Sequence, residues 1–290
     1  MKFLYIILIF VALMSLFSCQ KTGLFVANIP ANLSEVSAES TVSYGSEAWQ
    51  KLDIYRPSQH KTSTDLRPVV VFFYGGGWSS GSKGDYRFVA DKLTREGFVV
   101  IIPDYAKYPS YRYPAYQQDA AKVSRWLADN IESHGGDAKQ LHVLGHSAGA
   151  HIGAMLLADG RFLEAEGLAP NMYQSFVGLA GPYNFTPRAQ KYVNIFGPPE
   201  RFAEMQVSNF IDGSEPPMLL LHGGIDTTVG KFNLETLSKT ILSKQGRVEN
   251  KVYSAVGHLT IIGAFSRASP IGRQVTADAI AFFKRHSSGK

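Results

Sequence analysis

The stretch that decides the fold is Leu141-His142-Val143-Leu144-Gly145-His146-Ser147-Ala148-Gly149, followed by an apolar run from Ala150 to Leu157. An apolar strand thus leads through Gly-x-Ser-x-Gly into a helix, the context in which this motif raises a serine hydroxyl above a sheet. Gly145 and Gly149 are needed because side chains there would collide with neighbouring backbone. We predict Ser147 as a nucleophile. The alternative is a chance Gly-x-Ser-x-Gly at a strand–helix junction.

A second glycine-rich loop supports this prediction independently. The run PVVVFFY at residues 68–74 is typical of a strand buried on both faces, and it leads into Gly75-Gly76-Gly77. Consecutive glycines leave backbone N–H groups open, which suits an oxyanion hole facing a nucleophile. The predicted donors are the amides of Gly76, Gly77 and Ala148. A phosphate-binding loop is the alternative, but the chain has no Lys-Ser/Thr at P-loop spacing and no GxGxxG motif.

Strand-like and helix-like runs alternate along the rest of the chain. Strand-like runs lie at residues 42–44, 48–55, 68–74, 98–102, 141–144, 175–179 and 218–221. Helix-like stretches lie at residues 86–95, 116–131, 148–157, 234–243 and 274–285. The alternation predicts an α/β fold with a mostly parallel, doubly wound sheet and helices on both faces; the first two strands alternate like antiparallel ones. Residues 184–217 lack strand character and are interpreted as a small cap insertion.

The partners of Ser147 are expected after late strands, because loops at the carboxyl ends of parallel strands share one edge of a sheet. MLLLHGGID sets Asp226 in a glycine-rich turn, and VYSAVGH ends on His258. In the chain order serine, acid, histidine, His258 is the predicted general base and Asp226 the acid that orients it. The rival acid is Asp212. The rival bases, which we assign to packing or hydrogen bonding, are His146, His151 and His222.

The N-terminal residues resemble a bacterial lipoprotein signal. Lys2 precedes an apolar run from Phe3 to Phe17, which is shorter than the ~20 residues of a spanning helix. The run ends in Leu-Phe-Ser-Cys, similar to a lipobox, and Cys19 is the single cysteine. We predict a signal peptide at residues 1–18, lipidation of Cys19 and a tether at 19–41 before a catalytic domain at 42–290. The chain would then be lipid-anchored in the cell envelope, at the outer membrane. A plain signal peptide, which would leave the protein periplasmic, or an uncleaved anchor is the alternative.

The composition is that of an ordinary globular protein, with 290 residues, 45% apolar and 18% charged. The net charge is +5, and the basic residues are scattered, which argues against nucleic acid as a partner. No pair of histidines or carboxylates has metal-ligand spacing on one predicted element. We therefore expect neither a metal nor another cofactor, and a small-molecule ester or amide as the substrate.

With these motifs the chain resembles the α/β-hydrolase superfamily, specifically its hormone-sensitive-lipase-like and kynurenine-formamidase-like carboxylesterases. The resemblance runs from Trp49 to Phe283 and includes the stretches at 103–105, 113–115, 145–151 and 216–226, with Asp119 in the helix after the second stretch. It implies an eight-stranded-type sheet and a serine hydrolase that cleaves carboxylic esters. An arylformamidase-like amide hydrolase is the alternative, and a non-catalytic binding protein is the third hypothesis. In the family the glycine-rich loop usually starts with His, whereas here that residue is Tyr74, so the bracing of the loop is expected to differ.

Overall fold

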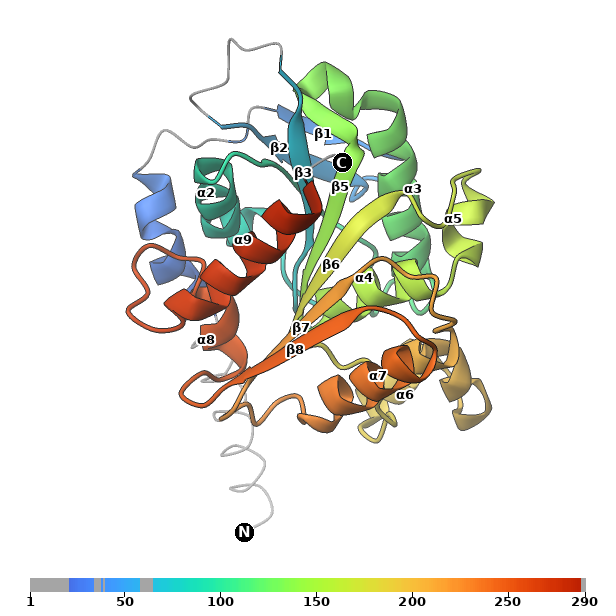
Figure 1. Ribbon diagram of the computed structural model, residues 1–290. Coiled ribbons are helices and arrows are strands. Elements are labelled where there is room, and N and C mark those ends of the chain that lie inside the picture. The colour runs from blue at the N-terminus through green and yellow to red at the C-terminus, as the bar shows by residue number, and fades with distance from the viewer. Residues whose placement is uncertain (1–20, 34–37, 39, 58–64, 288–290) are drawn as a thin grey trace, which may run out of the picture.

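The computed structural model describes residues 21–33, 38, 40–57 and 65–287, and these contain one eight-stranded sheet in the order β1-β2-β4-β3-β5-β6-β7-β8 (Figure 1). The strands are β1 (Ser40–Ser43), β2 (Lys51–Tyr55), β3 (Arg67–Phe73), β4 (Val99–Pro103), β5 (Gly136–His146), β6 (Tyr173–Leu179), β7 (Met218–Gly223) and β8 (Val248–Tyr253). β1 pairs with β2 and β2 with β4 in antiparallel fashion, and every later pair from β4 to β8 is parallel.

Helices cover both faces of this sheet. α2 and α9 lie on one face, and α3, α4 and α7 lie on the other (Figure 1). The α-helices are α2 (Arg87–Arg95), α3 (Ala115–Asn130), α4 (Ala148–Ala158), α5 (Arg161–Ala165), α6 (Gln190–Phe196), α7 (Phe232–Ser243), α8 (His258–Gly263) and α9 (Arg273–Ser287). Short 3₁₀ segments are η2 (Lys83–Tyr86), η3 (Ile131–His134), η4 (Pro199–Met205) and η5 (Val207–Asn209).

The centre of the sheet is fully enclosed. Residues 69–74 on and after β3 have no exposed surface, because β3 lies between β4 and β5 and helices cover both faces. That burial accounts for the unbroken apolar run PVVVFFY. The predicted mostly parallel sheet with helices on both faces is therefore confirmed. In the stretch 184–217, read from sequence as a cap, the structure has α6, η4 and η5 and no strand.

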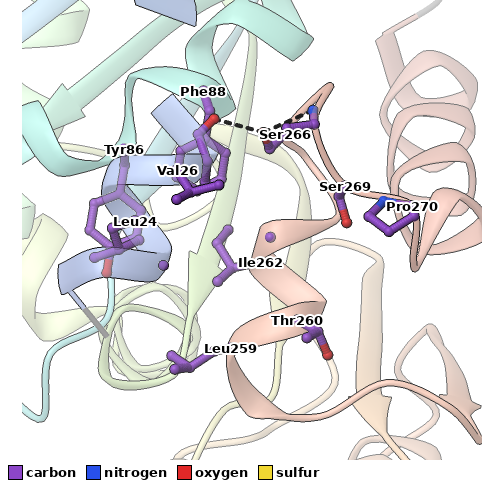
Figure 2. A pocket seen from close by; sticks show the side chains of 14 residues that line it. Leu24, Val26, Tyr86, Phe88, Leu259, Thr260, Ile262, Ser266, Ser269 and Pro270 are labelled. Carbon is purple, nitrogen blue, oxygen red and sulfur yellow. Dashed lines mark hydrogen bonds between the residues drawn. The ribbon is translucent and has the colours of Figure 1, made fainter. Parts of the chain in front are cut away.

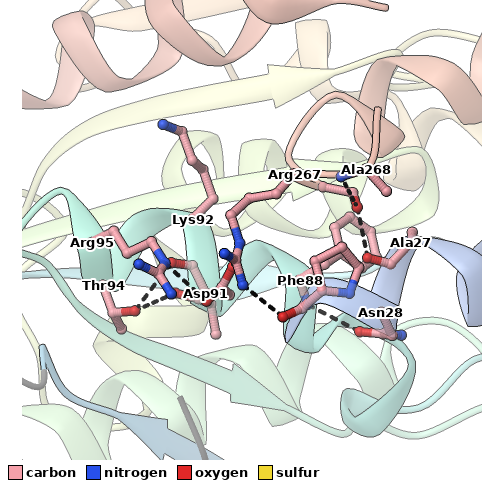
Figure 3. A network of polar contacts seen from close by, with 12 residues as sticks. Ala27, Asn28, Phe88, Asp91, Lys92, Thr94, Arg95, Arg267 and Ala268 are labelled. Atoms are coloured by element: carbon pink, nitrogen blue, oxygen red, sulfur yellow. Dashed lines mark hydrogen bonds and ion pairs between the residues drawn. The ribbon is translucent and has the colours of Figure 1, made fainter. Parts of the chain in front are cut away.

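The N-terminal helix, residues 21–32, differs from the tether that we predicted over 19–41. Leu24, Ala27, Asn28 and Ala31 recur at helical spacing on its inner face, and Asn28 and Ala31 are buried. The Asn28 side chain accepts a hydrogen bond from Phe88 N (3.0 Å) and donates one to Asp85 O (2.7 Å), as Figure 3 shows for Phe88. This segment is part of the domain because its polar and apolar groups are matched by the domain surface.

The loop between α8 and α9 holds the other side of this helix (Figure 3). Ser266 Oγ donates to Ala27 O (2.6 Å), and the Arg267 guanidinium donates to Pro30 O (2.6 Å). Arg267 also pairs with the buried Asp91 of α2 at 2.8 Å. The N-terminal helix is thus fastened between α2 and this loop.

The predicted signal peptide (1–18) and Cys19 lie outside the described residues. Among the helices that are described, none has both the length and the apolar character that a membrane crossing requires.

Candidate active site

Ser147 lies in the turn between β5 and α4, where its backbone has φ 53° and ψ −124°. Such a conformation costs a residue with a side chain about 1–3 kcal/mol and persists only where neighbours enforce it. The close approach of β3 is one such constraint, because a Cβ on Gly149 would lie 2.0 Å from Phe73 O. The strained turn predicted from the Gly-x-Ser-x-Gly spacing is therefore present.

The structure brings Ser147, His258 and Asp226 together in one hydrogen-bonded chain. His258 Nε2 lies 2.9 Å from Ser147 Oγ, and His258 Nδ1 lies 2.8 Å from Asp226 Oδ2. His258 is the first residue of α8, after β8, and Asp226 lies in the turn after β7. With Nδ1–H donating to the carboxylate, Nε2 is left as the acceptor that faces the serine hydroxyl.

Asp226 is set up to stay ionised. Its side chain has no exposed surface, and its other oxygen, Oδ1, accepts hydrogen bonds from Thr228 N (2.8 Å) and Val229 N (2.9 Å). Burial by itself raises the pKa of Asp226, but the hydrogen bond from His258 and those two amides outweigh it and hold the pKa below its usual value. A carboxylate that keeps its charge while buried fixes the imidazole orientation and stabilises an imidazolium.

The glycine-rich loop lies directly beside Ser147. A Cβ on Gly75 would be 3.0 Å from Ser147 Cβ, so the loop's backbone approaches the serine closely. Gly76 has φ 140°, a conformation that favours glycine, and its carbonyl accepts hydrogen bonds from Ser79 N and Ser80 N (both 3.1 Å). Within the described chain, the amides of Gly76, Gly77 and Ala148 donate no hydrogen bond to a protein acceptor. These three N–H groups are therefore available to an added oxygen atom.

Tyr74, where the family usually has His, braces this loop in its own way. Its ring is buried between Tyr86 (5.4 Å between centroids) and Tyr105 (4.7 Å). Its hydroxyl donates to Asp104 Oδ1 (2.5 Å), and the same oxygen accepts a hydrogen bond from Lys83 N (2.9 Å). Burial and the nearby Tyr105 and Asp104 raise the pKa of Tyr74 well above its usual value, so its proton stays available for this bond. The start of the loop is thus held by the stacking of Tyr74 between two other tyrosine rings and by its hydrogen bond to Asp104.

The rival residues have other roles. Asp212 is a turn residue whose carboxylate accepts a hydrogen bond from Ser214 N (2.8 Å). His151 Nε2 is bonded to Met205 O (2.8 Å) and His146 Nε2 to His258 O (3.0 Å). Burial lowers the pKa of His146 to about 3, and the adjacent His258 adds to that shift. His146 thus stays neutral and supports the backbone of His258. Burial also lowers the pKa of His222.

The side chains that α6 places beside the glycine-rich loop were not predicted from the sequence. The ring of Trp78, directly after the loop, packs edge-on against Phe196 of α6 (4.8 Å between centroids). From the same helix, Lys191 Nζ and Tyr192 OH would lie 3.4 and 3.6 Å from a Cβ on Gly77. The aromatic spacing within residues 184–217 was the available signal. In the described ranges, no group of three or more His, Cys, Asp or Glu side chains is arranged to hold a metal ion.

Comparison with known proteins identifies relatives named as esterases or formamidases. Isoprenylcysteine alpha-carbonyl methylesterase ICME of Arabidopsis thaliana is 26% identical over 240 residues, 75% of this chain and 56% of that protein. Esterase LipC of Mycobacterium tuberculosis is 28% identical over 264 residues, 83% of this chain and 63% of that protein. Kynurenine formamidase of Danio rerio is 32% identical over 153 residues, 53% and 49% of the two chains. This chain therefore spans about half to three-fifths of the length of these relatives.

Solved structures of esterases share the fold. Esterase B of Lactobacillus rhamnosis superposes with a TM-score of 0.81 at 18% identity, over 95% of this chain and 93% of that chain. Thermogutta terrifontis esterase 2 superposes with a TM-score of 0.72 at 20% identity, over 89% and 98% of the two chains. The predicted α/β-hydrolase fold is confirmed. The family model described as BD-FAE matches residues 52–241.

Proposed function

The chain belongs to the BD-FAE family, and from that premise we propose that it is a serine hydrolase that cleaves carboxylic esters through an acyl-enzyme intermediate. The observation that carries this proposal is the continuous hydrogen-bonded chain from Ser147 through His258 to Asp226, at 2.9 and 2.8 Å. Distances of this size are those that a nucleophile and its base require. The esterase names of the relatives support the substrate class.

In the proposed reaction, Ser147 Oγ attacks the carbonyl carbon of the ester while its proton passes to His258 Nε2. The carbonyl oxygen takes the electron pair and receives hydrogen bonds from the amides of Gly76, Gly77 and Ala148. The carbonyl reforms, the C–O bond to the alcohol breaks, and His258 Nε2–H protonates the leaving oxygen. A water molecule, which gives its proton to His258 Nε2, then attacks the carbonyl carbon of the acyl-enzyme. The bond to Ser147 Oγ breaks, His258 returns the proton to Ser147 Oγ, and the carboxylic acid is released.

Amide hydrolysis of the formamidase type is the second candidate, because a relative with that name is 32% identical over 153 residues. The same three backbone donors serve an ester and an amide, since both give a tetrahedral intermediate with the same charge. Paired substrates that share one aryl group separate the two candidates. The ester proposal predicts a higher kcat/KM for the aryl acetate than for the N-formyl aryl amide. The reverse order favours the formamidase.

The proposal is tested with an active-serine probe and a panel of short and long acyl esters and acetylated sugars. Ser147→Ala is expected to abolish labelling and to lower kcat by about 10⁶-fold, because the nucleophile is removed. Ser243→Ala on α7, an exposed serine, serves as the matched control and should keep both. Equal labelling of wild type and Ser147→Ala, with hydrolysis retained, would show that Ser147 is not the nucleophile.

We also propose that Cys19 is lipidated and holds the protein at the envelope membrane. The support is the sequence Leu16-Phe17-Ser18-Cys19 after an apolar run, with no other cysteine in the chain. Growth with a labelled fatty acid should mark the wild-type chain and leave Cys19→Ser unmarked. Fatty-acid label that persists in Cys19→Ser would contradict this part of the proposal.

A further inference from the structure

The N-terminal helix exposes an apolar stripe on the side that faces away from the domain. Phe25, Ile29 and Leu33 are 67%, 41% and 84% exposed, and Val26 beside them is 48% exposed. Residues four apart share one face of a helix, and the hydrogen bond from Leu33 N to Ile29 O (3.1 Å) extends the helical path to Leu33. These four side chains, which we call the outer stripe, form one continuous surface.

The outer stripe belongs to a helix that is firmly docked. Its opposite face is fastened by Asn28 to η2 and α2, and by Ser266 and Arg267 to the loop after α8. Figure 3 shows Asn28, Phe88 and Arg267 in these contacts. The helix thus has an apolar outer face in addition to its buried inner face. Because the inner face is docked, the outer stripe is exposed at a fixed place on the domain surface. Contiguous exposed apolar surface of this kind marks an interaction site.

An apolar pocket continues this surface toward α8. The cavity holds about 260 Å³ and lies between Leu24, Val26 and Phe88 on one side and Leu259 and Ile262 on the other, as Figure 2 shows. Val26 belongs both to the outer stripe and to the pocket wall. Leu259 is itself 43% exposed, and it directly follows His258. The surface therefore reaches the edge of the sheet where Ser147 lies.

The adjoining sequence indicates which partner this surface meets. The apolar run Phe3 to Phe17 and Cys19 precede the helix, and Cys19 is only two residues from Lys21. At about 3.3–3.6 Å per residue, a lipid on Cys19 or a retained apolar segment keeps the start of the helix within about 10 Å of a bilayer. Residues 21–33 contain no acidic side chain, and Lys21 is their one charge. An apolar helix face with a basic end suits the boundary between headgroups and acyl chains.

We propose that the outer stripe, with the rim of the adjacent pocket, docks on the surface of a lipid bilayer. The four apolar side chains enter the interface, and the helix axis lies along the membrane plane. Because the same surface continues to Leu259, the edge of the sheet that holds Ser147 and His258 is held close to the membrane. This docking does not require the proposed hydrolytic activity, so the two are tested by separate measurements.

Fluorescence quenching on vesicles tests the docking. The full chain is used in a Cys19→Ser background, so that a polarity-sensitive dye attaches only to an introduced cysteine at Phe25→Cys or Ile29→Cys. Thr236→Cys on α7, an exposed position on a distant helix, is the matched control. On phosphatidylcholine–phosphatidylglycerol vesicles, dyes at 25 and 29 should shift to the blue and be quenched several-fold by brominated acyl chains. The dye at 236 should do neither.

Three outcomes overturn the proposal. Quenching at 25 and 29 no stronger than at 236 would place the outer stripe in water. A blue shift without bromine quenching would show that protein, such as a second copy of this chain, covers the stripe. Adding Leu33→Ser and Val26→Ser to the Phe25→Cys chain should reduce quenching several-fold, with an unchanged thermal unfolding midpoint. Quenching that persists in this variant would show that the apolar run at 3–17, and not the outer stripe, holds the dye at the bilayer. Hydrolysis of a water-soluble ester by these chains reports on the active site alone.

Discussion

The site around Ser147 and the N-terminal helix lie toward the same edge of the molecule, yet they are held in different ways. Ser147 is positioned by its own strand and helix, with a backbone strained to φ 53° and Gly149 pressed against β3. The N-terminal helix is positioned by side chains, chiefly Asn28 and the contacts of Ser266 and Arg267. Backbone geometry fixes a reacting atom closely, whereas a few hydrogen bonds suffice to orient a surface. Variants in the first region should therefore change the rate of hydrolysis. Variants in the second should change the free energy of unfolding or the proposed docking on a bilayer.

Among variants that keep the nucleophile, Asp226→Asn has the largest expected effect: it should lower kcat by about 10⁴-fold with little change in the free energy of unfolding. The amide oxygen at 226 would stay with Thr228 N and Val229 N, so its NH₂ group would face His258 Nδ1. The imidazole would then present the wrong tautomer to Ser147. Steady-state kinetics and thermal unfolding measure the two quantities. Asp212→Asn is the control, and an equal loss of rate there would transfer the acid role to Asp212.

Acid should lower the free energy of unfolding through three buried histidines on the strand and helix that flank Ser147. Burial lowers the pKa of His142 and His146 to about 3 and of His151 to about 4, compared with 6.5 in an exposed histidine. Below pH 6.5 the unfolded chain binds protons that the folded chain does not, so the free energy of unfolding falls as the pH falls. The three histidines together give a loss of about 4 kcal/mol between pH 6 and pH 5. Urea unfolding at several pH values measures it.

A single variant isolates one of these histidines. His142→Gln should flatten the dependence of unfolding free energy on pH by about a quarter to a third, because one of the four buried histidines whose pKa is lowered, His222 included, is removed. The residues 21–33 contain no histidine, so the contacts of the N-terminal helix are outside this effect. A slope that His142→Gln leaves unchanged would contradict the assignment.

The smallest expected effect is that of Asn28→Ala, which should lower the free energy of unfolding by about 1–3 kcal/mol at unchanged kcat. The buried Phe88 N and Asp85 O would lose their partner, and an unpaired buried group costs about that much. Chemical unfolding and ester kinetics provide the measurements. Asn32→Ala, an exposed asparagine of the same helix, should change stability by less than about 0.5 kcal/mol. A matching loss of kcat in Asn28→Ala would mean that the helix also positions the site.

Several elements escaped the sequence pattern for physical reasons. β8 is an edge strand with mostly exposed residues, so it has no apolar run to mark it. α6 is short, and its register is set by the contact of Phe196 with Trp78, which lies far away in sequence. The N-terminal helix was predicted to be a tether because residues 20–41 are polar and weakly patterned, and its buried inner face includes the polar Asn28. A polar residue on a buried face is explained only by its partners.

The sequence by itself determined the α/β fold, and it named Ser147, Asp226 and His258 before their distances were known. Ser147 and Asp226 each follow an apolar strand and stand in a glycine-rich turn, signals that are contained in a few neighbouring residues. His258 follows the exposed strand β8 and was predicted from the chain order serine, acid, histidine. Only the tertiary structure decided how Tyr74 braces the glycine-rich loop through Asp104, and that the N-terminal helix docks with an apolar face left outside. These features depend on groups 30 to 60 residues apart or more, whose meeting no local pattern encodes.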